Sequence, residues 1–525
     1  MMKRYILLAI LSIQLIGCSK DDFLDQPLRG RQELDDYFSN AENSELFVNS
    51  VYTNVNGESW YEIEFFRQIC EMATDDNWAG NTEQPRPDIT GIAAFNVFAG
   101  SGYINSFYEN TYIGITRANI ALERIPAVSM DDNLKARLMG EARFLRAWYY
   151  FDLARNFGGV PIVTMYTELL QPDITNTTRA SLDEVYDFVE AELAVAITEL
   201  PLKSGYAADD AGRATKGAAQ TLLAKVYLYR EKWSLAQNMA QQVISSGEYQ
   251  LEPLFENIHS VHNHHGVESI FEVDMITNFQ FTDIGGTIST TSGSRADQGW
   301  GWCTPSSDLE NAFLSENDQV RLRSTIIKHG EPVYGDPAVP VFNAALASNK
   351  SGRINRKAYI PVADRESPYQ IGQHPLPVIR FRLADVILMH AEASFFAGDE
   401  QAALQSLQQI RNRVSLETNM GMSGNTLRDA IWKERRLELA LEQERFYDIK
   451  RQKINGIPRI ATIMGPNGTF VQYNTQVSTD PFERTNNGEA QNKGALFNPG
   501  VHLLWPIPPR EIQLSGGVIT QNPGY

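Results

Sequence analysis

Residues 74–81 place one aromatic side chain among short polar ones: Trp78 stands beside Asp75, Asp76, Asn77 and Asn81. Ligand sites combine aromatic side chains with a few well-placed hydrogen-bond donors and acceptors. This segment offers both, and we predict that it contacts a ligand. The alternative is that Trp78 is buried and holds its own loop in place.

A second segment of the same kind contains two tryptophans that are two residues apart. Trp300 and Trp302 are separated by a glycine, and Arg295 precedes them. In an extended strand, side chains at i and i+2 point to the same face, so both indoles would form one platform. Glycines also permit close approach of a ligand. We predict that Arg295, Trp300 and Trp302 bind the ligand, again with loop packing as the alternative.

Other aromatic and basic residues in the loops are further candidates for the same site, namely Arg86, Tyr103 and Tyr359. Trp60, which lies in a loop, is also a candidate. Four tryptophans are assigned to packing, because they lie in predicted helices or among prolines. They are Trp148, Trp233, Trp432 and Trp505.

Half of the eight histidines gather in one short stretch, at positions 259, 262, 264 and 265. Histidine is a common zinc ligand, but this stretch has no recognised ligand spacing such as H-E-x-x-H. A polar turn in contact with water explains the cluster equally well. We therefore predict neither a bound metal nor any other cofactor.

The loop carboxylates raise the alternative of an enzyme. A glycoside hydrolase needs two carboxyl groups about 5–9.5 Å apart, and Asp75 and Asp76 are the loop pair beside a candidate platform. The side chains of adjacent residues tend to diverge, and the chain has no P-loop, G-x-S-x-G or H-E-x-x-H motif. We predict a binding protein rather than an enzyme. A surface glycoside hydrolase, a peptide receptor and a protein-interaction adaptor are the alternatives.

The N-terminus has the pattern of a secretory signal. Lys3 and Arg4 precede an apolar run that ends at Ile16. This run is much shorter than the ~20 apolar residues needed to span a bilayer, so it predicts a signal peptide over residues 1–17 rather than a membrane anchor.

Leu15-Ile16-Gly17-Cys18 resembles the bacterial lipobox, in which the cysteine is acylated and becomes the first mature residue. Stable anchoring takes more than one acyl chain, which a lipoprotein cysteine supplies. We predict that Cys18 anchors the protein through an acidic tether at residues 18–30. Ser19-Lys20-Asp21-Asp22 resembles the tag that directs lipoproteins of Bacteroidetes-type bacteria to the outer face of the outer membrane. The alternative is an ordinary secretory signal with an incidental cysteine.

The composition argues against a nucleic-acid partner, a disulfide framework and a division into several domains. Without residues 1–17 the chain has 44 basic and 64 acidic residues, a net charge of −20, and this argues against a nucleic-acid partner. Only Cys70 and Cys303 follow Cys18, so no disulfide framework exists, although one bridge between them is left open. No low-complexity linker divides residues 31–525, which we predict to form a single domain.

The elements that must position these residues are mostly helices. Residues 131–159 read as one long helix, because apolar side chains recur at three- and four-residue spacing on two faces and Gly158-Gly159 ends the pattern. The same periodicity predicts helices near 107–125, 181–200, 213–231, 233–246, 380–397, 400–414 and 427–452. Strand-like alternation is scarce, so the predicted fold class is mostly α.

Helix pairs near 107–160, 181–246 and 380–452 indicate a repeated architecture. Small alanines and a bulky residue before each turn recur at matching offsets in 224–243 and 391–410. This resembles the tetratricopeptide unit, a helix pair that buries its apolar face by stacking on its neighbours. Long irregular tracts near 54–106, 248–305 and 330–378 interrupt the helices, and tracts of this length commonly serve as binding loops.

Five motifs, taken together, resemble the RagB/SusD family of outer-membrane lipoproteins. They are 141–161 (EARFLRAWYYFDLARNFGGVP), 213–228 (RATKGAAQTLLAKVYL), 380–393 (RFRLADVILMHAEA), 434–449 (ERRLELALEQERFYDI) and the ending 504–525 (LWPIPPREI…QNPGY). Phe23-Leu24-Asp25, just after the lipid cysteine, is a further similarity.

The resemblance implies a tetratricopeptide-like helical scaffold with ligand loops. It also implies a lipoprotein that captures glycans, or occasionally peptides, for a SusC-like TonB-dependent transporter, without enzyme activity. Most motif residues are expected to be scaffold. Arg382 and Asp385 are assigned to structure, and the spacing of Glu442, Arg445 and Asp448 predicts a ladder of ion pairs along one helix face.

Overall fold

The computed structural model describes residues 34–55, 63–80, 86–166, 178–275, 287–331, 341–343, 349, 351–365, 375–485 and 493–525. Within these ranges helices dominate, and the strands form four separate antiparallel pairs. The predicted mostly helical class with little sheet is confirmed. The predicted signal peptide, Cys18 and the tether lie outside the described residues.

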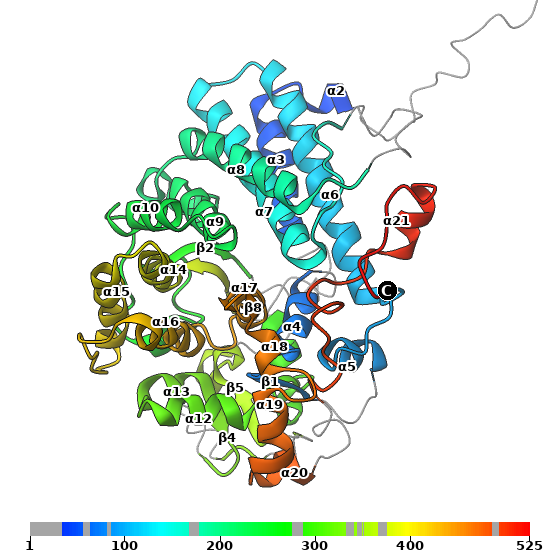
Figure 1. Ribbon diagram of the computed structural model, residues 1–525. Helices are drawn as coiled ribbons and strands as arrows, with labels where there is room; N and C mark the ends of the chain where they lie inside the picture. Colours follow the sequence, from blue (N-terminus) through cyan, green and yellow to red (C-terminus); the bar gives the residue numbers. More distant parts are fainter. Residues whose placement is uncertain are drawn as a thin grey trace, which may run out of the picture.

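Long helices of the N-terminal half form the upper part of the molecule (Figure 1). They are α3 (Ala41–Tyr52), α6 (Gly102–Arg124), α7 (Asp132–Phe157) and α8 (Leu182–Glu199). The Asp131 side chain accepts hydrogen bonds from the first free N–H groups of α7, and Gly158, with φ 76°, ends the helix. Every residue of α7 from Phe144 to Phe157 is buried, which confirms that this helix is covered on more than one side.

Helix pairs continue the scaffold as a curved arc (Figure 1). They comprise α9 (Lys216–Tyr229), α10 (Trp233–Ile244), α14 (Leu383–Phe396), α15 (Glu400–Arg413) and α16 (Gly424–Glu438). α9 packs on α8 and α10, and α10 in turn packs on α14, which contacts α15 and α16. The rings of Trp233 and Phe396 stack at 4.5 Å where two pairs meet. The predicted stacking of helix pairs is therefore confirmed.

The predicted helix over 427–452 is wrong in its middle. α16 ends at Glu438, and α17 (Arg445–Arg451) begins only after a turn in which Leu441 and Gln443 have φ of 65° and 67°. The predicted ladder is also wrong, because Glu442 turns away to Lys357 and Arg382, at 2.6 and 2.8 Å. An ion pair with a buried charge on another element is stronger than an ion pair along one helix face, because water screens the latter.

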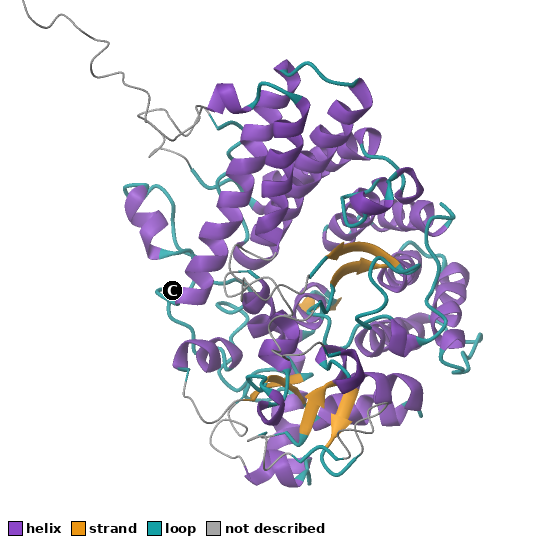
Figure 2. Cartoon of the chain, turned by 180° about the vertical axis from the view of Figure 1, so that it is seen from behind, coloured by secondary structure: helices purple, strands orange, loops and turns teal. Residues whose placement is uncertain are grey.

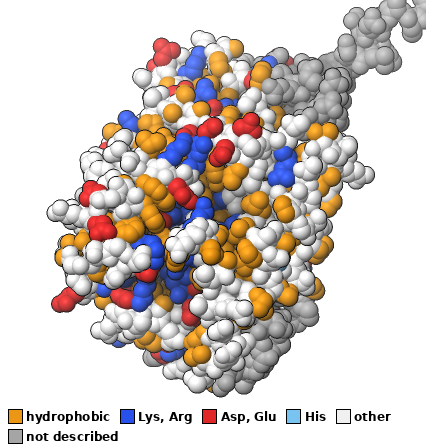
Figure 3. Space-filling model, in the orientation of Figure 1, with side chains coloured by type: hydrophobic (Ala, Val, Ile, Leu, Met, Phe, Trp, Pro, Cys, Tyr) orange, Lys and Arg blue, Asp and Glu red, His pale blue; other side chains and the backbone are white. Residues whose placement is uncertain are grey.

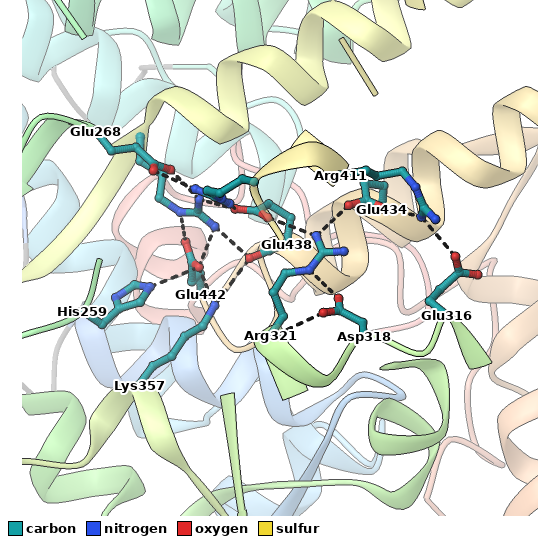
Figure 4. Close-up of polar contacts among 12 residues, drawn as sticks. His259, Glu268, Glu316, Asp318, Arg321, Lys357, Arg411, Glu434, Glu438 and Glu442 are labelled. Carbon is teal, nitrogen blue, oxygen red and sulfur yellow. Dashed lines mark hydrogen bonds and ion pairs between the residues drawn. The ribbon is translucent and has the colours of Figure 1, made fainter. Parts of the chain in front are cut away.

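A network of buried charges connects α16 to its surroundings (Figure 4). Glu438 accepts hydrogen bonds from Arg382 at 2.6 Å, from Arg321 at 3.1 Å and from Arg413. These arginines outweigh the effect of burial and lower the pKa of Glu438 well below its usual range. The network also includes His259, Glu268, Glu316, Asp318, Lys357, Arg411, Glu434 and Glu442. Charges buried this deeply are tolerated only when they are paired, so the network fixes the relative positions of these elements.

Short elements and strand pairs fill the rest of the molecule. Seen from behind, the strands lie on the inner side of the helical arc and in the part below it (Figure 2). The pairs are β1 (Asn77–Gly80) with β3 (Trp302–Pro305), β2 (Ser269–Val273) with β6 (Val378–Arg382), β4 (Ile326–Lys328) with β5 (Arg353–Asn355), and β7 (Lys453–Ile454) with β8 (Ile457–Pro458). The short helices are α2 (Leu34–Tyr37), α4 (Glu64–Met72), α5 (Pro87–Ala93), α11 (Thr287–Ser292), α12 (Ser307–Ser315), α13 (Gln319–Thr325), α18 (Ile460–Ile463), α19 (Thr469–Gln472), α20 (Pro481–Thr485) and α21 (Pro509–Leu514).

The main hydrophobic core runs from α4 and the loop segments into α7, α9 and α14. Cys70 and Cys303 both lie in this core as free thiols, which answers the disulfide question left open by the sequence. Burial raises the pKa of the Cys70 thiol to about 12, so this thiol stays protonated at neutral pH.

Candidate ligand-binding site

The two tryptophan-containing segments predicted to bind a ligand lie side by side. β1 and β3 pair in antiparallel register, with Trp78 opposite Thr304 and Gly80 opposite Trp302. Gly80 has a φ of 93°, and a Cβ on it would lie 2.2 Å from the Gly301 carbonyl oxygen. Only glycine fits this close approach, which brings together two segments that are more than 200 residues apart in the chain.

Asp75 and Asp76 are buried beneath this strand pair. Arg445 of α17 donates two hydrogen bonds to Asp75, at 2.9 and 2.7 Å, and Arg436 of α16 donates to Asp76 at 2.7 Å. The exposed fractions of the two aspartates are 4% and 0%. Burial alone would raise the pKa of Asp75, but Arg436 and Arg445 outweigh it and lower that pKa. These carboxylates therefore tie the loop to the helical scaffold and do not face a ligand at the surface.

Trp78 is also an anchor, because its indole is 7% exposed. Its Nε1 donates to Glu483 at 2.8 Å, its ring meets that of Phe470 at 5.7 Å, and the Lys493 ammonium lies 5.0 Å from its ring centroid. These contacts match the alternative interpretation, in which the tryptophan holds its own loop. Asn77 is fully buried in β1, and Asn81 lies outside the described residues.

The predicted common platform of Trp300 and Trp302 is wrong. Gly301 has a φ of 73°, so the chain is not extended across the two residues and β3 begins only at Trp302. Trp302 is 3% exposed and lies in the core, whereas Trp300 is only half-buried against it. Of the tryptophans predicted to bind the ligand and described by the structure, Trp300 alone is not fully buried, and Trp60 lies outside the described residues.

The loop that carries Trp300 is folded tightly on itself. The Trp300 N–H donates to the Thr290 carbonyl at 2.8 Å, and the Gly301 N–H donates to the Gly293 carbonyl at 2.9 Å. Arg295 is half-buried, and its side chain lies alongside Gly301. These contacts fix the position of Trp300 relative to the strand pair and thus provide the rigidity that a ligand platform needs.

An ion pair connects this loop to the segment of Tyr359. Asp297 accepts two hydrogen bonds from Arg365, at 2.7 and 2.5 Å, and the Arg365 guanidinium lies 5.5 Å from the Tyr359 ring centroid. Tyr359 borders a polar cavity of about 190 Å³, which is lined also by His259 and Arg356. The structure thus places Trp300, Arg295 and Tyr359 on connected segments.

Phe98 is an exposed aromatic side chain that the sequence analysis missed. At 58%, it is the only aromatic residue in the described ranges whose exposed fraction exceeds about a third. It lies in the loop between α5, which packs on β1, and α6. Most of its neighbours are small or polar residues (NVFAGSG), a pattern that indicates an exposed aromatic side chain. Nearby, Arg86 is exposed at the start of α5, and Tyr103 is half-buried against Phe65.

Charged side chains of both signs gather over α16 and α17 on one face of the molecule (Figure 3). No helix in the described ranges combines the length and the apolar character needed to cross a bilayer.

Comparison with known proteins points to one family along the whole chain. Residues 268–525 match the model of the SusD family, and residues 22–228 match a model described as "Starch-binding associating with outer membrane". SusD-like protein P2 of Formosa agariphila is 25% identical over the full length of both chains. A SusD-like protein of Bacteroides ovatus is 23% identical, over 86% of this chain and 82% of its own.

Solved structures agree with these matches. A laminarin-binding SusD-like protein superposes with a TM-score of 0.74 at 27% identity, covering 93% of this chain and all of its own. A SusD-like protein of Bacteroides fragilis has a TM-score of 0.76 at 23% identity, over 95% of this chain. The motifs, the tetratricopeptide-like helix pairs and these matches agree, and the chain belongs to the SusD-like family.

Proposed function

We propose that this protein is a cell-surface lipoprotein that captures an oligo- or polysaccharide and delivers it to a SusC-like TonB-dependent transporter. The observation that carries the proposal is a pair of aromatic side chains that the loops leave at the surface: Phe98 is 58% exposed, and Trp300, on a tightly folded loop, is only half-buried. A sugar ring packs its C–H face on such side chains. The likeness to a laminarin-binding protein over 93% of the chain supports a glycan as the ligand.

Within this proposal, the predicted site residues divide into two groups. Trp300 and Arg295 contact the glycan, together with Tyr359, whose segment is joined to their loop by the Asp297–Arg365 ion pair, and Phe98 in the loop between α5 and α6. The second group lies beneath them and holds the loops in place: Asp75, Asp76, Asn77, Trp78 and Trp302 are all buried. Asn81 stays a predicted ligand contact outside the described residues.

The protein acts by binding and not by catalysis. A glycosidase needs a carboxyl group that donates a proton, and therefore one with a raised pKa near the bound sugar. Arginines lower the pKa of Asp75, whereas burial raises that of Asp76, but both carboxylates are held by arginines inside the protein and do not reach a ligand at the surface. This supports the assignment of the pair to structure.

Lipidation of Cys18 would keep the receptor at the outer membrane beside its transporter. The lipobox-like LIGC, the acidic residues that follow it and the family model's description of outer-membrane association support this placement. Binding at the membrane raises the local concentration of glycan for the transporter.

Calorimetric titration of the purified full-length protein against a panel of polysaccharides, laminarin and starch included, tests the proposal. We expect one class to bind, and Trp300→Ala to weaken it about tenfold, which corresponds to ~1.4 kcal/mol. Trp233→Ala is the matched control, because Trp233 is equally half-buried but stacks on Phe396 in the helical arc. Absence of any glycan binding, or unchanged binding by both Trp300→Ala and Phe98→Ala, would contradict the proposal.

A further inference from the structure

Four ligating side chains that are not assigned to the glycan meet around the end of β2. His264 Nδ1 lies 2.9 Å from Asp274 Oδ1 and 3.9 Å from Glu272 Oε1. His265 Nε2 lies 2.7 Å from the other oxygen of Asp274. The sequence favoured a polar turn here because it lacks a recognised ligand spacing, but the fold brings carboxylates from β2 onto the histidines.

The local structure explains why these groups converge. Glu272 in β2 and Asp274 just after it are two residues apart, so an extended chain directs both side chains to the same face. Pairing of Glu272 with Ile379 of β6 fixes the strand. Lys203 fixes the turn that carries the histidines, because its ammonium donates to the carbonyls of His265, Gly266 and Ser269 at 2.8–3.1 Å.

The spacing of the ligand atoms matches a metal site. A tetrahedral zinc ion with bonds of about 2.0–2.2 Å holds its ligand atoms about 3.4 Å apart. The distances from His264 Nδ1 to the other two proposed ligands, 2.9 Å to Asp274 Oδ1 and 3.9 Å to Glu272 Oε1, lie on either side of this value. One ligand atom each from His264, Glu272 and Asp274 falls within 4.8 Å of the others, so small side-chain rotations suffice.

Glu272 supplies a second, independent indication of a ligand. Its side chain is buried, with a residue exposure of 2%, and its Oε1 accepts a hydrogen bond from the His265 N–H at 3.1 Å. Its Oε2 is also buried and has no hydrogen-bond partner among the described residues. Buried carboxylate oxygens are normally satisfied, and a cation would satisfy this one.

We propose that His264, Glu272 and Asp274 bind a divalent transition-metal ion, with Zn²⁺ preferred, and that His265 orients Asp274 through its second oxygen. The imidazole ligand favours zinc over Ca²⁺ or Mg²⁺, which take sets of oxygen ligands. A hydrogen bond on the second carboxylate oxygen is the usual support for a metal-bound carboxylate. Asp274 is 45% and His264 28% exposed, so the ion can enter from solvent and keep a water ligand.

The expected role of the ion is to cross-link the histidine turn to β2. β2 pairs with β6, which leads directly into α14, so the ion would tie this turn to the helical scaffold. The site is independent of the glycan proposal, since it uses none of the residues assigned to the glycan.

The test uses the purified full-length protein with an affinity tag that contains no histidine, freed of metal by chelation and dialysis. Calorimetric titration with ZnCl₂ is expected to show one ion per chain at micromolar affinity or tighter, with weaker binding of Ca²⁺. Zinc is also expected to raise the melting temperature. His264→Ala and Asp274→Asn are each expected to weaken zinc binding about tenfold or more and to abolish the thermal shift.

His262→Ala is the matched control, because His262 belongs to the same turn but is 72% exposed and pairs with Asp364 instead. It should bind zinc as the wild type does. Circular dichroism checks that each variant is folded, and Asp274→Asn changes a side chain that is 45% exposed. Absence of a one-to-one zinc isotherm in the wild type, or equal affinity in wild type, His264→Ala and Asp274→Asn, would overturn the proposal.

Discussion

Replacing Asp75 by Asn tests whether this carboxylate stabilises the fold or binds the ligand. The substitution keeps the shape of the side chain and removes its charge. Asp75 is 4% exposed and accepts two hydrogen bonds from Arg445, which is 5% exposed, while Arg436 lies 3.2 Å away. In the variant, Arg445 keeps its charge inside the protein, with Asp76 at 3.9 Å as its nearest remaining acidic partner.

The expected loss of stability follows from this geometry. Breaking a buried ion pair by removing one partner costs about 3–5 kcal/mol, because the other charge stays buried and uncompensated. The asparagine oxygen can still accept one hydrogen bond and Asp76 remains, so we expect the lower end, about 3 kcal/mol. Asp75→Asn combined with Arg445→Met should recover part of this loss, since it removes both charges and fills the space with apolar atoms.

Urea unfolding followed by tryptophan fluorescence measures the loss, and glycan titration of the folded protein measures binding. Asp187→Asn is the matched control, because Asp187 also pairs with an arginine, at 2.6 Å, but is 65% exposed and should change stability by less than about 1 kcal/mol. We expect Asp75→Asn to lose stability and to bind glycan normally once folded. An Asp75→Asn protein that unfolds like the wild type but no longer binds glycan would refute the structural assignment.

Two further predictions concern buried titratable groups. Burial lowers the pKa of Lys493 from its ordinary 10.5 to about 7, so as pH falls across this window the unfolded chain takes up the proton first and stability decreases. Urea unfolding at several pH values measures how the free energy of unfolding depends on pH. We expect this dependence in the wild type and in Lys453→Met, a control at an exposed lysine, and a weaker dependence in Lys493→Met. Equal slopes in all three proteins would contradict the prediction. Cys70 and Cys303 are buried free thiols with raised pKa values, so iodoacetamide should label them only after unfolding, as read by peptide mapping. Labelling of either in the native protein, or a bridged peptide, would contradict this prediction.

The sequence predicted the helical scaffold well because its signal is local. Helix periodicity, the Asp131 cap and the terminating Gly158 are all encoded within a few residues of α7. The prediction of one continuous helix over 427–452 was wrong, because the helical pattern of the sequence continues from α16 into α17. The break between them depends on Glu442 turning to Arg382 and Lys357, partners that come from distant parts of the chain.

The candidate site was less predictable for the same reason. Whether a loop tryptophan faces a ligand or the core depends on which residues pack against it. Trp78 donates its hydrogen bond to Glu483, which is more than 400 residues away in the chain. The composition of residues 74–81 is equally consistent with both outcomes. Trp302 likewise became buried by pairing with a strand near the start of the chain, opposite Gly80. Phe98 was not predicted, although the small and polar residues around it in the sequence indicate an exposed loop.

The motif at residues 434–449 acts as a hub between the scaffold and the ligand loops. Arg436 holds Asp76 and Asp308, Arg445 holds Asp75, and Glu438 joins the buried network of Figure 4. The motif thus serves packing and charge pairing, and none of these three side chains is free for a ligand.

Phe98 and Trp300, the aromatic side chains proposed to contact the glycan, lie outside every motif that identifies the family. Substitution at either position would leave the ion pairs of the hub intact, because neither side chain takes part in them. Substitution within the hub would instead lower the stability of the folded protein. The division predicts that ligand preference can change through a few loop aromatics while the charged framework beneath them stays as it is.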